Sequence, residues 1–225
     1  MRIGGFQRFS LIDYPGKICA VVFTQGCNFR CGYCHNPELV PRTEGKISEE
    51  AVLSFLERRR SLLDAVTITG GEPLLQEDIA DFIRKVKEKG FSVKLDTNGS
   101  FPERLSSLLN ELDYVAMDVK APLYKYKSVV GVNINEEKIK KSIEIIMNSG
   151  VDYEFRTTVV RSELSKEDII EIGRMLKGAK RFVLQKVRTE KVLNGRFRTA
   201  KTYSDAEFED MRRELERYVE ECIVR

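Results

Sequence analysis

Six short runs rich in β-branched residues alternate with amphipathic stretches along this 225-residue chain. The runs, each expected to be a strand, are 18–24, 65–69, 91–96, 113–119, 151–160 and 181–187. The stretches expected to be helices are 48–62, 76–89, 101–110, 135–149, 165–176 and 204–222. Alternation of this kind favours a parallel sheet with right-handed crossovers. Six units are too few for a closed eight-stranded barrel, so the pattern predicts an α/β fold with a curved, open (β/α)6 sheet.

Local signals support several of these boundaries. Ser165 and Ser204 each stand three residues before an acidic residue, as helix N-caps do. Gly90 and Gly150 each follow a predicted helix and precede a predicted strand, where a helix commonly stops. We find no internal repeat, low-complexity tract or linker. A chain of this length can bury one large core, so we expect a single domain over 1–225.

Composition narrows the functional class. Hydrophobic residues make up 42% and charged residues 32% of the chain, as in soluble globular proteins. No apolar run approaches the ~20 residues of a spanning helix, so we expect a cytoplasmic protein without a membrane partner. A net charge of +3 does not favour nucleic acid. The stretch 177–201, however, holds nine Lys or Arg and one acidic residue. A solvated basic face is its ordinary interpretation, and docking of an acidic partner or a phosphate is the alternative.

The loop 25–37 holds three cysteines, Cys27, Cys31 and Cys34, in the spacing C-x3-C-x2-C. Thiolates select zinc, copper(I) or iron–sulfur clusters. A cluster of four irons and four sulfurs normally takes one Cys at each iron. Three cysteines with no fourth nearby therefore predict a 4Fe–4S cluster with one open iron, where a substrate or cofactor can bind.

Two other interpretations of the cysteines fit less well. Structural zinc takes four ligands in two spaced pairs, and the only extra candidate is His35, directly after Cys34. Disulfides are disfavoured because the cysteine count is odd and no N-terminal signal segment is present. We expect Cys19, within an apolar strand, and Cys222, on the apolar stripe of the final helix, to be core residues.

With Tyr33 as the aromatic residue before Cys34, the loop resembles the signature of the radical S-adenosylmethionine (radical SAM) superfamily. The run 26–37 resembles that of glycyl-radical activating enzymes. The runs 9–16 and 117–120 are most similar to the activating proteins of anaerobic ribonucleoside-triphosphate reductase. The resemblance extends from about residue 3 to about residue 190. It implies a partial (β/α)6 barrel, a 4Fe–4S cluster on the three cysteines, and S-adenosylmethionine at the open iron.

Polar residues gather after the predicted strands, where α/β folds place their functional groups. Gly70, Gly71 and Glu72 follow the second predicted strand. Close backbone approach at glycine and a carboxylate that accepts from an amine suit the amino end of S-adenosylmethionine. An ordinary turn with a solvent-facing Glu72 is the alternative. Lys120 or Arg156 would pair with the methionine carboxylate, unless Lys120 simply forms a structural ion pair with Asp118.

The remaining candidates would hold the nucleoside. Asp96 and Asn98 suit the ribose hydroxyls. Alternatively, residues 97–99 form a turn in which Asn98 and Gly99 supply positive φ. Asp96 and Asp118 could instead share a cation. Tyr33, His35 and Asn36 follow the second cluster cysteine and are placed to contact adenine.

The resemblance also implies a reaction. A reduced cluster cleaves S-adenosylmethionine to methionine and a 5′-deoxyadenosyl radical, which takes a hydrogen atom from a backbone glycine of anaerobic ribonucleotide reductase. A flavodoxin- or ferredoxin-type protein would supply the electron. Other possibilities are a pyruvate formate-lyase-type activase, a small-molecule enzyme similar to 7-carboxy-7-deazaguanine synthases, and a non-catalytic metal-binding module. The synthases carry Asp-Thr where this chain has His35 and Asn36, which favours the activase.

Overall fold

The computed structural model describes all residues from Met1 to Arg225, and these form two compact units. The first unit comprises Met1–Asn28, Glu38–Thr97 and Glu103–Val115. The second comprises Phe29–Pro37, Asn98–Pro102 and Ala116–Arg225. The single-domain organisation stays a prediction.

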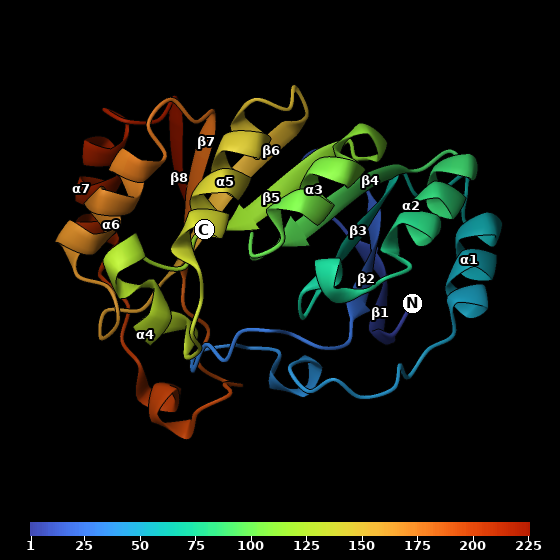
Figure 1. Cartoon of the computed structure of the whole chain (residues 1–225), viewed down its shortest axis with the longest axis horizontal. Coiled ribbons are helices and arrows are strands. Elements are labelled where there is room, and N and C mark those ends of the chain that lie inside the picture. Colours follow the sequence, from blue (N-terminus) through green and yellow to red (C-terminus); the bar gives the residue numbers. More distant parts are fainter. The chain divides into compact units, whose positions relative to one another are not determined.

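The first unit is built on four hydrogen-bonded strands in chain order. They are β1 (Ile3–Ser10), β2 (Cys19–Thr24), β3 (Ala65–Gly70) and β4 (Ser92–Thr97). Strands β2, β3 and β4 are parallel, as predicted, and β1 pairs antiparallel with β2. Helices α1 (Glu49–Arg58) and α2 (Ile79–Glu88) connect the parallel strands and lie side by side (Figure 1). Helix α3 (Pro102–Leu108) starts at the boundary with the second unit and leads, through a short turn, to β5 (Tyr114–Asp118).

The second unit contains three parallel strands, β6 (Asp152–Val159), β7 (Arg181–Lys186) and β8 (Glu221–Val224). Helices α4 (Tyr126–Val130) and α5 (Glu136–Met147) precede β6. Helix α6 (Lys166–Met175) connects β6 to β7, and α7 (Asp205–Leu215) connects β7 to β8. Helix α7 packs against α6 and β8 (Figure 1). A five-residue 3-10 helix, η5 (Gly195–Thr199), lies between β7 and α7.

Buried aliphatic and aromatic side chains line the parallel strands of both units. Val21, Val66 and Val93 of the first unit have no exposed surface, nor do Phe155 and Phe182 of the second. Apolar residues run almost without interruption along these strands because a parallel strand is covered on both faces. The six predicted strands are confirmed as β2 to β7.

The predicted helix signals are also confirmed. Ser165 and Ser204 each form a complete capping box with the acidic residue three positions later. Gly90 and Gly150 both have positive φ, of 86° and 75°.

The prediction for the end of the chain is wrong. A single helix was expected over 204–222, but α7 ends at Leu215 and Cys222 lies in β8, opposite Phe182 of β7. The apolar positions continue at helical spacing through Cys222. Residues 221–224 nevertheless form a strand, because their backbone N–H and C=O groups find hydrogen-bond partners at the edge of β7. Cys222 and Cys19 are buried, as predicted. Burial raises the pKa of Cys19 and raises that of Cys222 to about 12.

Candidate active site

In the first unit, the Gly70–Glu72 segment is bound to the start of the cysteine loop. The Gly71 amide donates to the Thr24 carbonyl at 3.0 Å, and the Glu72 amide donates to the Gly26 carbonyl at 2.9 Å. A Cβ atom on Gly71 would lie 2.1 Å from the Gly26 carbonyl oxygen, so no other residue fits there without movement of the backbone. Gly26 directly precedes Cys27, whose amide donates to the Val40 carbonyl. This packing explains the glycine, and a close approach to a cofactor stays a prediction.

Glu72 is completely buried, so the alternative of a solvent-facing side chain is wrong. One of its carboxylate oxygens accepts hydrogen bonds from the Thr97 hydroxyl at 2.8 Å and the Leu74 amide at 3.0 Å. Glu72 thereby caps the turn Pro73–Leu75. The sequence did not identify Thr97 as a partner because the contact joins the ends of two strands that are distant in the chain.

Asp96 forms an ion pair with a lysine of its own strand. The Lys94 ammonium lies 2.5 Å from the Asp96 carboxylate, and Lys94 is almost fully buried. Residues two apart in a strand point to the same face, which brings the two side chains together. Lys94 was not among the predicted site residues, although its i, i+2 spacing from Asp96 on a predicted strand is a signal for this pair.

In the second unit, the later part of the cysteine loop is held by backbone hydrogen bonds from two other segments. The Arg30 amide donates to the Val130 carbonyl, the Leu193 amide to the Cys34 carbonyl, and the Asn194 amide to the Gly32 carbonyl. Cys31 is buried and Cys34 is partly exposed. All five cysteines of the chain are free thiols, which agrees with the interpretation of the loop as a set of thiolate ligands.

Asp118, Lys120 and Arg156 form one buried ion cluster. Arg156 Nε lies 2.9 Å from one oxygen of Asp118, and Lys120 Nζ lies 3.0 Å from the other. The three side chains are only 12–24% exposed. Burial opposes the charge on Asp118, but Arg156 and Lys120 outweigh it and hold the pKa of this carboxyl well below its ordinary value. Burial also opposes the charge on Lys120, whose pKa Asp118 nevertheless raises well above the ordinary value.

Two tyrosines lie close to this cluster. The Tyr126 hydroxyl accepts from the Lys120 amide at 3.2 Å, and its ring meets Phe29 edge to face. Tyr126 was not among the predicted site residues. Tyr33 is 5% exposed, and its hydroxyl has no hydrogen-bond partner. Burial raises the pKa of Tyr33 well above its ordinary value, and Cys31 adds to this effect. Tyr33 packs on Phe197, with the ring centroids 6.1 Å apart.

The other candidates of the second unit have local partners. His35 and Asn36 are at least partly exposed, and their side-chain nitrogens lie 3.4 Å apart. The Asn98 side chain accepts from the amide and hydroxyl of Ser100. Gly99 has a positive φ of 75°, whereas Asn98 does not, so the expectation of positive φ at both residues is wrong for Asn98.

The structure thus brings together some of the candidates of each unit, whereas Asp96, Asn98, His35 and Asn36 have separate local partners. The first unit joins Gly71 and Glu72 to Gly26, the residue that precedes Cys27. The second joins Asp118, Lys120 and Arg156, and the charges of Asp118 and Lys120 act on the pKa of Tyr33. Asp96 and Asp118 each have a side-chain cation as partner. Neither unit by itself gathers three or more His, Cys, Asp or Glu into a group that could hold a metal ion.

The residues present fit the predicted cofactors in two respects. Three thiols within eight residues of chain are the donor type that binds an iron–sulfur cluster. A buried hydroxyl without a partner costs free energy, and the Tyr33 hydroxyl is such a group beside Cys31 and Lys120. It therefore has a donor and an acceptor to offer a bound molecule.

Comparison with known proteins agrees with this interpretation. A family model described as the radical SAM superfamily matches residues 21–176. A protein of Methanocaldococcus jannaschii that bears the provisional name of a glycyl-radical enzyme activating enzyme is 33% identical over 230 residues, which cover 99% of this chain and 95% of that protein. The pyruvate formate-lyase-activating enzyme of Clostridium pasteurianum is 33% identical over 184 residues, which cover 78% of this chain and 76% of that enzyme.

Among solved structures, Streptococcus suis SuiB bound to its precursor peptide SuiA matches with a TM-score of 0.72 and 16% identity. The match covers 91% of this chain and 48% of SuiB, so the chain spans about half the length of that protein. This likeness concerns the fold alone. Together with the family match it confirms the predicted fold class, the α/β fold of radical SAM enzymes. No helix of the chain is both long and apolar enough to span a bilayer.

Proposed function

Because the chain belongs to the glycyl-radical enzyme activating enzymes of the radical SAM superfamily, we propose that it activates an anaerobic ribonucleoside-triphosphate reductase. It would do so by forming a glycyl radical on the reductase. The cofactors of the superfamily are a 4Fe–4S cluster and S-adenosylmethionine. The observation that carries the activase assignment is the match over 99% of the chain to a protein named as a glycyl-radical enzyme activating enzyme. The choice of the reductase is supported by the runs 9–16 and 117–120.

Three cysteines, Cys27, Cys31 and Cys34, would hold the cluster. When bound, the cluster and S-adenosylmethionine supply a one-electron cleavage that yields a 5′-deoxyadenosyl radical. The protein contributes orientation and exclusion of water. Asp118 holds Lys120 and Arg156 in place, so that either cation can pair with the methionine carboxylate.

The other candidates are assigned to the rest of the cofactor. Glu72, supported by Gly70 and Gly71, would accept from the methionine amine. Asp96 and Asn98 would bind the ribose. Tyr33, His35 and Asn36 would contact adenine, and the buried Tyr33 hydroxyl supports this assignment because it has no partner in the protein.

A pyruvate formate-lyase is the second candidate acceptor. The observation that favours it is the 33% identity with the C. pasteurianum enzyme over most of both chains. The electron donor proposed for either acceptor is a flavodoxin- or ferredoxin-type protein, and the proposed location is the cytoplasm.

The test is anaerobic reconstitution with iron and sulfide, followed by dithionite and S-adenosylmethionine in the presence of either candidate acceptor. Electron paramagnetic resonance detects a glycyl doublet, and chromatography detects 5′-deoxyadenosine. A doublet on the reductase alone supports the proposal, and a doublet on pyruvate formate-lyase alone replaces the acceptor. Formation of 5′-deoxyadenosine without either doublet would contradict the choice of both acceptors.

Two cysteine variants control this experiment. Cys31→Ala removes a proposed ligand and should abolish both the bound iron and the formation of 5′-deoxyadenosine. Cys222→Ala changes a buried thiol of β8 and should leave both intact. Iron content that survives in Cys31→Ala would contradict the ligand assignment.

A further inference from the structure

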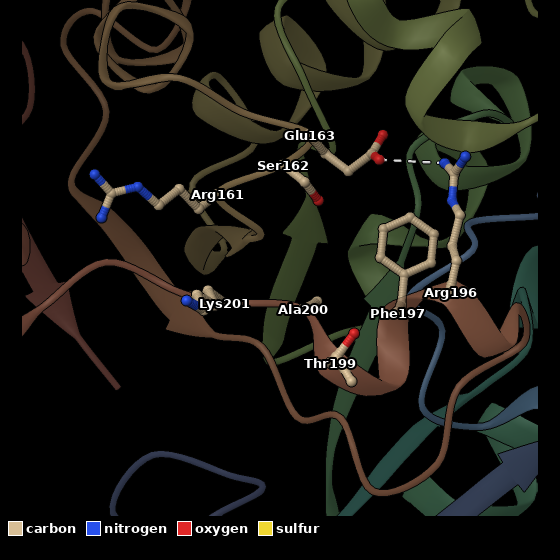
Figure 2. A pocket seen from close by; sticks show the side chains of 8 residues that line it. All are labelled: Arg161, Ser162, Glu163, Arg196, Phe197, Thr199, Ala200 and Lys201. Atoms are coloured by element: carbon tan, nitrogen blue, oxygen red, sulfur yellow. Dashed lines mark hydrogen bonds and ion pairs between the residues drawn. The ribbon is translucent and has the colours of Figure 1, made fainter.

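A surface pocket of the second unit lies beside the cysteine loop, and one of its lining residues, Phe197, packs on Tyr33 of the site described above. Its volume is about 620 Å³, within the range of ligand pockets. Two segments form it, the turn 161–163 after β6 and the segment 196–201, which begins within η5 (Figure 2). A backbone hydrogen bond from the Arg161 amide to the Lys201 carbonyl, 3.0 Å long, joins the two segments.

Three of the lining side chains are cations. Arg196 pairs with Glu163 at 3.2 Å, and the two lie together at one end of the pocket in Figure 2. Arg161, whose guanidinium points away from that pair, lies 3.2 Å from Glu207 and is 53% exposed. Lys201 is exposed. The pocket therefore carries a net positive charge that mostly exposed side chains can present to a ligand.

The rest of the lining is neutral. Phe197 provides a buried aromatic ring, and Ser162 and Thr199 provide hydroxyls (Figure 2). Hydroxyls can both donate to and accept from a peptide backbone. Separate cations with a carboxylate among them suit carboxylates spaced along a polypeptide. A continuous polyanion such as nucleic acid would be repelled by Glu163 and by Glu207 beside Arg161.

The pocket wall is continuous with the cysteine loop. Leu193 and Asn194, just before η5, donate to the Cys34 and Gly32 carbonyls at 3.1 and 2.9 Å. Phe197 packs so closely on the loop that a Cβ atom on Gly32 would lie 2.3 Å from its ring. A partner held in the pocket is thus held next to the proposed cluster ligands.

From these observations we propose that the pocket formed by 161–163 and 196–201 docks an acidic, extended segment of the protein substrate. The identity of the partner rests on the proposed function; the binding of an acidic polypeptide does not. Docking here would use charges outside the site for S-adenosylmethionine, so recognition of the partner and radical chemistry depend on different side chains.

The experiment measures fluorescence anisotropy of a short labelled peptide of glutamates alternating with glycine and leucine, titrated with the full chain at low ionic strength. A peptide with glutamine at every glutamate is the ligand control. The double variant Arg161→Gln with Lys201→Gln should weaken binding about tenfold. The matched double variant Lys177→Gln with Arg188→Gln removes the same charges from exposed positions of the 177–201 stretch outside the pocket. It should weaken binding by less than about twofold.

A third variant tests for a gain. Glu163→Gln removes the carboxylate that pairs with Arg196 and should tighten binding of the acidic peptide about threefold. This result cannot come from a protein that fails to fold.

Several outcomes would overturn the inference. They are no binding of the acidic peptide, equal binding of the glutamine peptide, equal losses in the two double variants, and tighter binding of inorganic phosphate or a single-stranded oligonucleotide that displaces the peptide. Because the titration needs neither cluster nor S-adenosylmethionine, its failure would leave the activase assignment untouched. A chain that binds the peptide but forms no glycyl radical would instead contradict the proposed function.

Discussion

Replacement of Asp118 by asparagine should destabilise the protein strongly, because the Asp118 carboxylate lies between two buried cations and pairs with both. Its oxygens lie 2.9 Å from Arg156 and 3.0 Å from Lys120, which are 12% and 15% exposed. Loss of one partner of a buried ion pair costs about 3–5 kcal/mol, chiefly because a charge is left buried and unpaired. Since these groups keep some contact with water, we expect a loss of about 3 kcal/mol in the free energy of unfolding.

The matched control is Asp205→Asn, which breaks the ion pair between Asp205 and Lys186. There the side chains are 89% and 42% exposed, and the expected loss is below about 0.5 kcal/mol. Both variants are measured by urea unfolding followed by far-ultraviolet circular dichroism, since the chain has no tryptophan to report by fluorescence. If Asp118→Asn costs no more than Asp205→Asn, the buried cluster does not have the stabilising role assigned to it.

The effect of Asp118 should also depend on pH. Its pKa is lower in the folded protein than in the unfolded chain, so the unfolded state binds a proton first as the pH falls. The stabilisation by Asp118 is therefore complete above the unfolded pKa of about 3.9. It is lost progressively below that pH, towards the folded pKa. The stability difference between wild type and Asp118→Asn should shrink when urea unfolding is repeated below about pH 4. A difference that stays constant there would refute the sign of the shift.

Three further predictions concern single residues. Gly71→Ala should lower the melting temperature, because the added methyl group would lie 2.1 Å from the Gly26 carbonyl oxygen. The control Gly195→Ala should not lower it, because the space around Gly195 is open. Equal melting temperatures for the two variants would contradict the close packing at Gly71. Tyr33→Phe should leave the free energy of unfolding of the cofactor-free chain unchanged or raise it by about 1 kcal/mol, because the lost hydroxyl is buried without a partner. If urea unfolding instead shows a loss of about 1 kcal/mol, the Tyr33 hydroxyl does form a hydrogen bond in the folded protein. Ser165→Ala should lower the free energy of unfolding by about 1 kcal/mol in the same assay, because the N-cap of α6 is lost. An unchanged denaturation midpoint would show that the capping box does not stabilise the protein.

Local features of the sequence determined the order of strands and helices, several helix ends and the cysteine spacing of this protein. The alternation of strands and helices, the serine caps of α6 and α7 and the stops at Gly90 and Gly150 depend on neighbouring residues, and all are found in the structure. The cysteine spacing in 25–37 also reads directly from the chain, and the match to the radical SAM family agrees with it.

Contacts between distant residues were decided only by the tertiary structure. Apolar positions near Cys222 satisfy both the helical and the strand period, and only the free edge of β7 selects the strand. Likewise, Glu72 has the Thr97 hydroxyl as a partner 25 positions away and Asp118 has Arg156 as a partner 38 positions away, and the basic pocket joins residues 161–163 to 196–201. No local pattern encodes such pairings, because their free energy comes from burial and charge neutralisation that exist only after the strands and loops have come together.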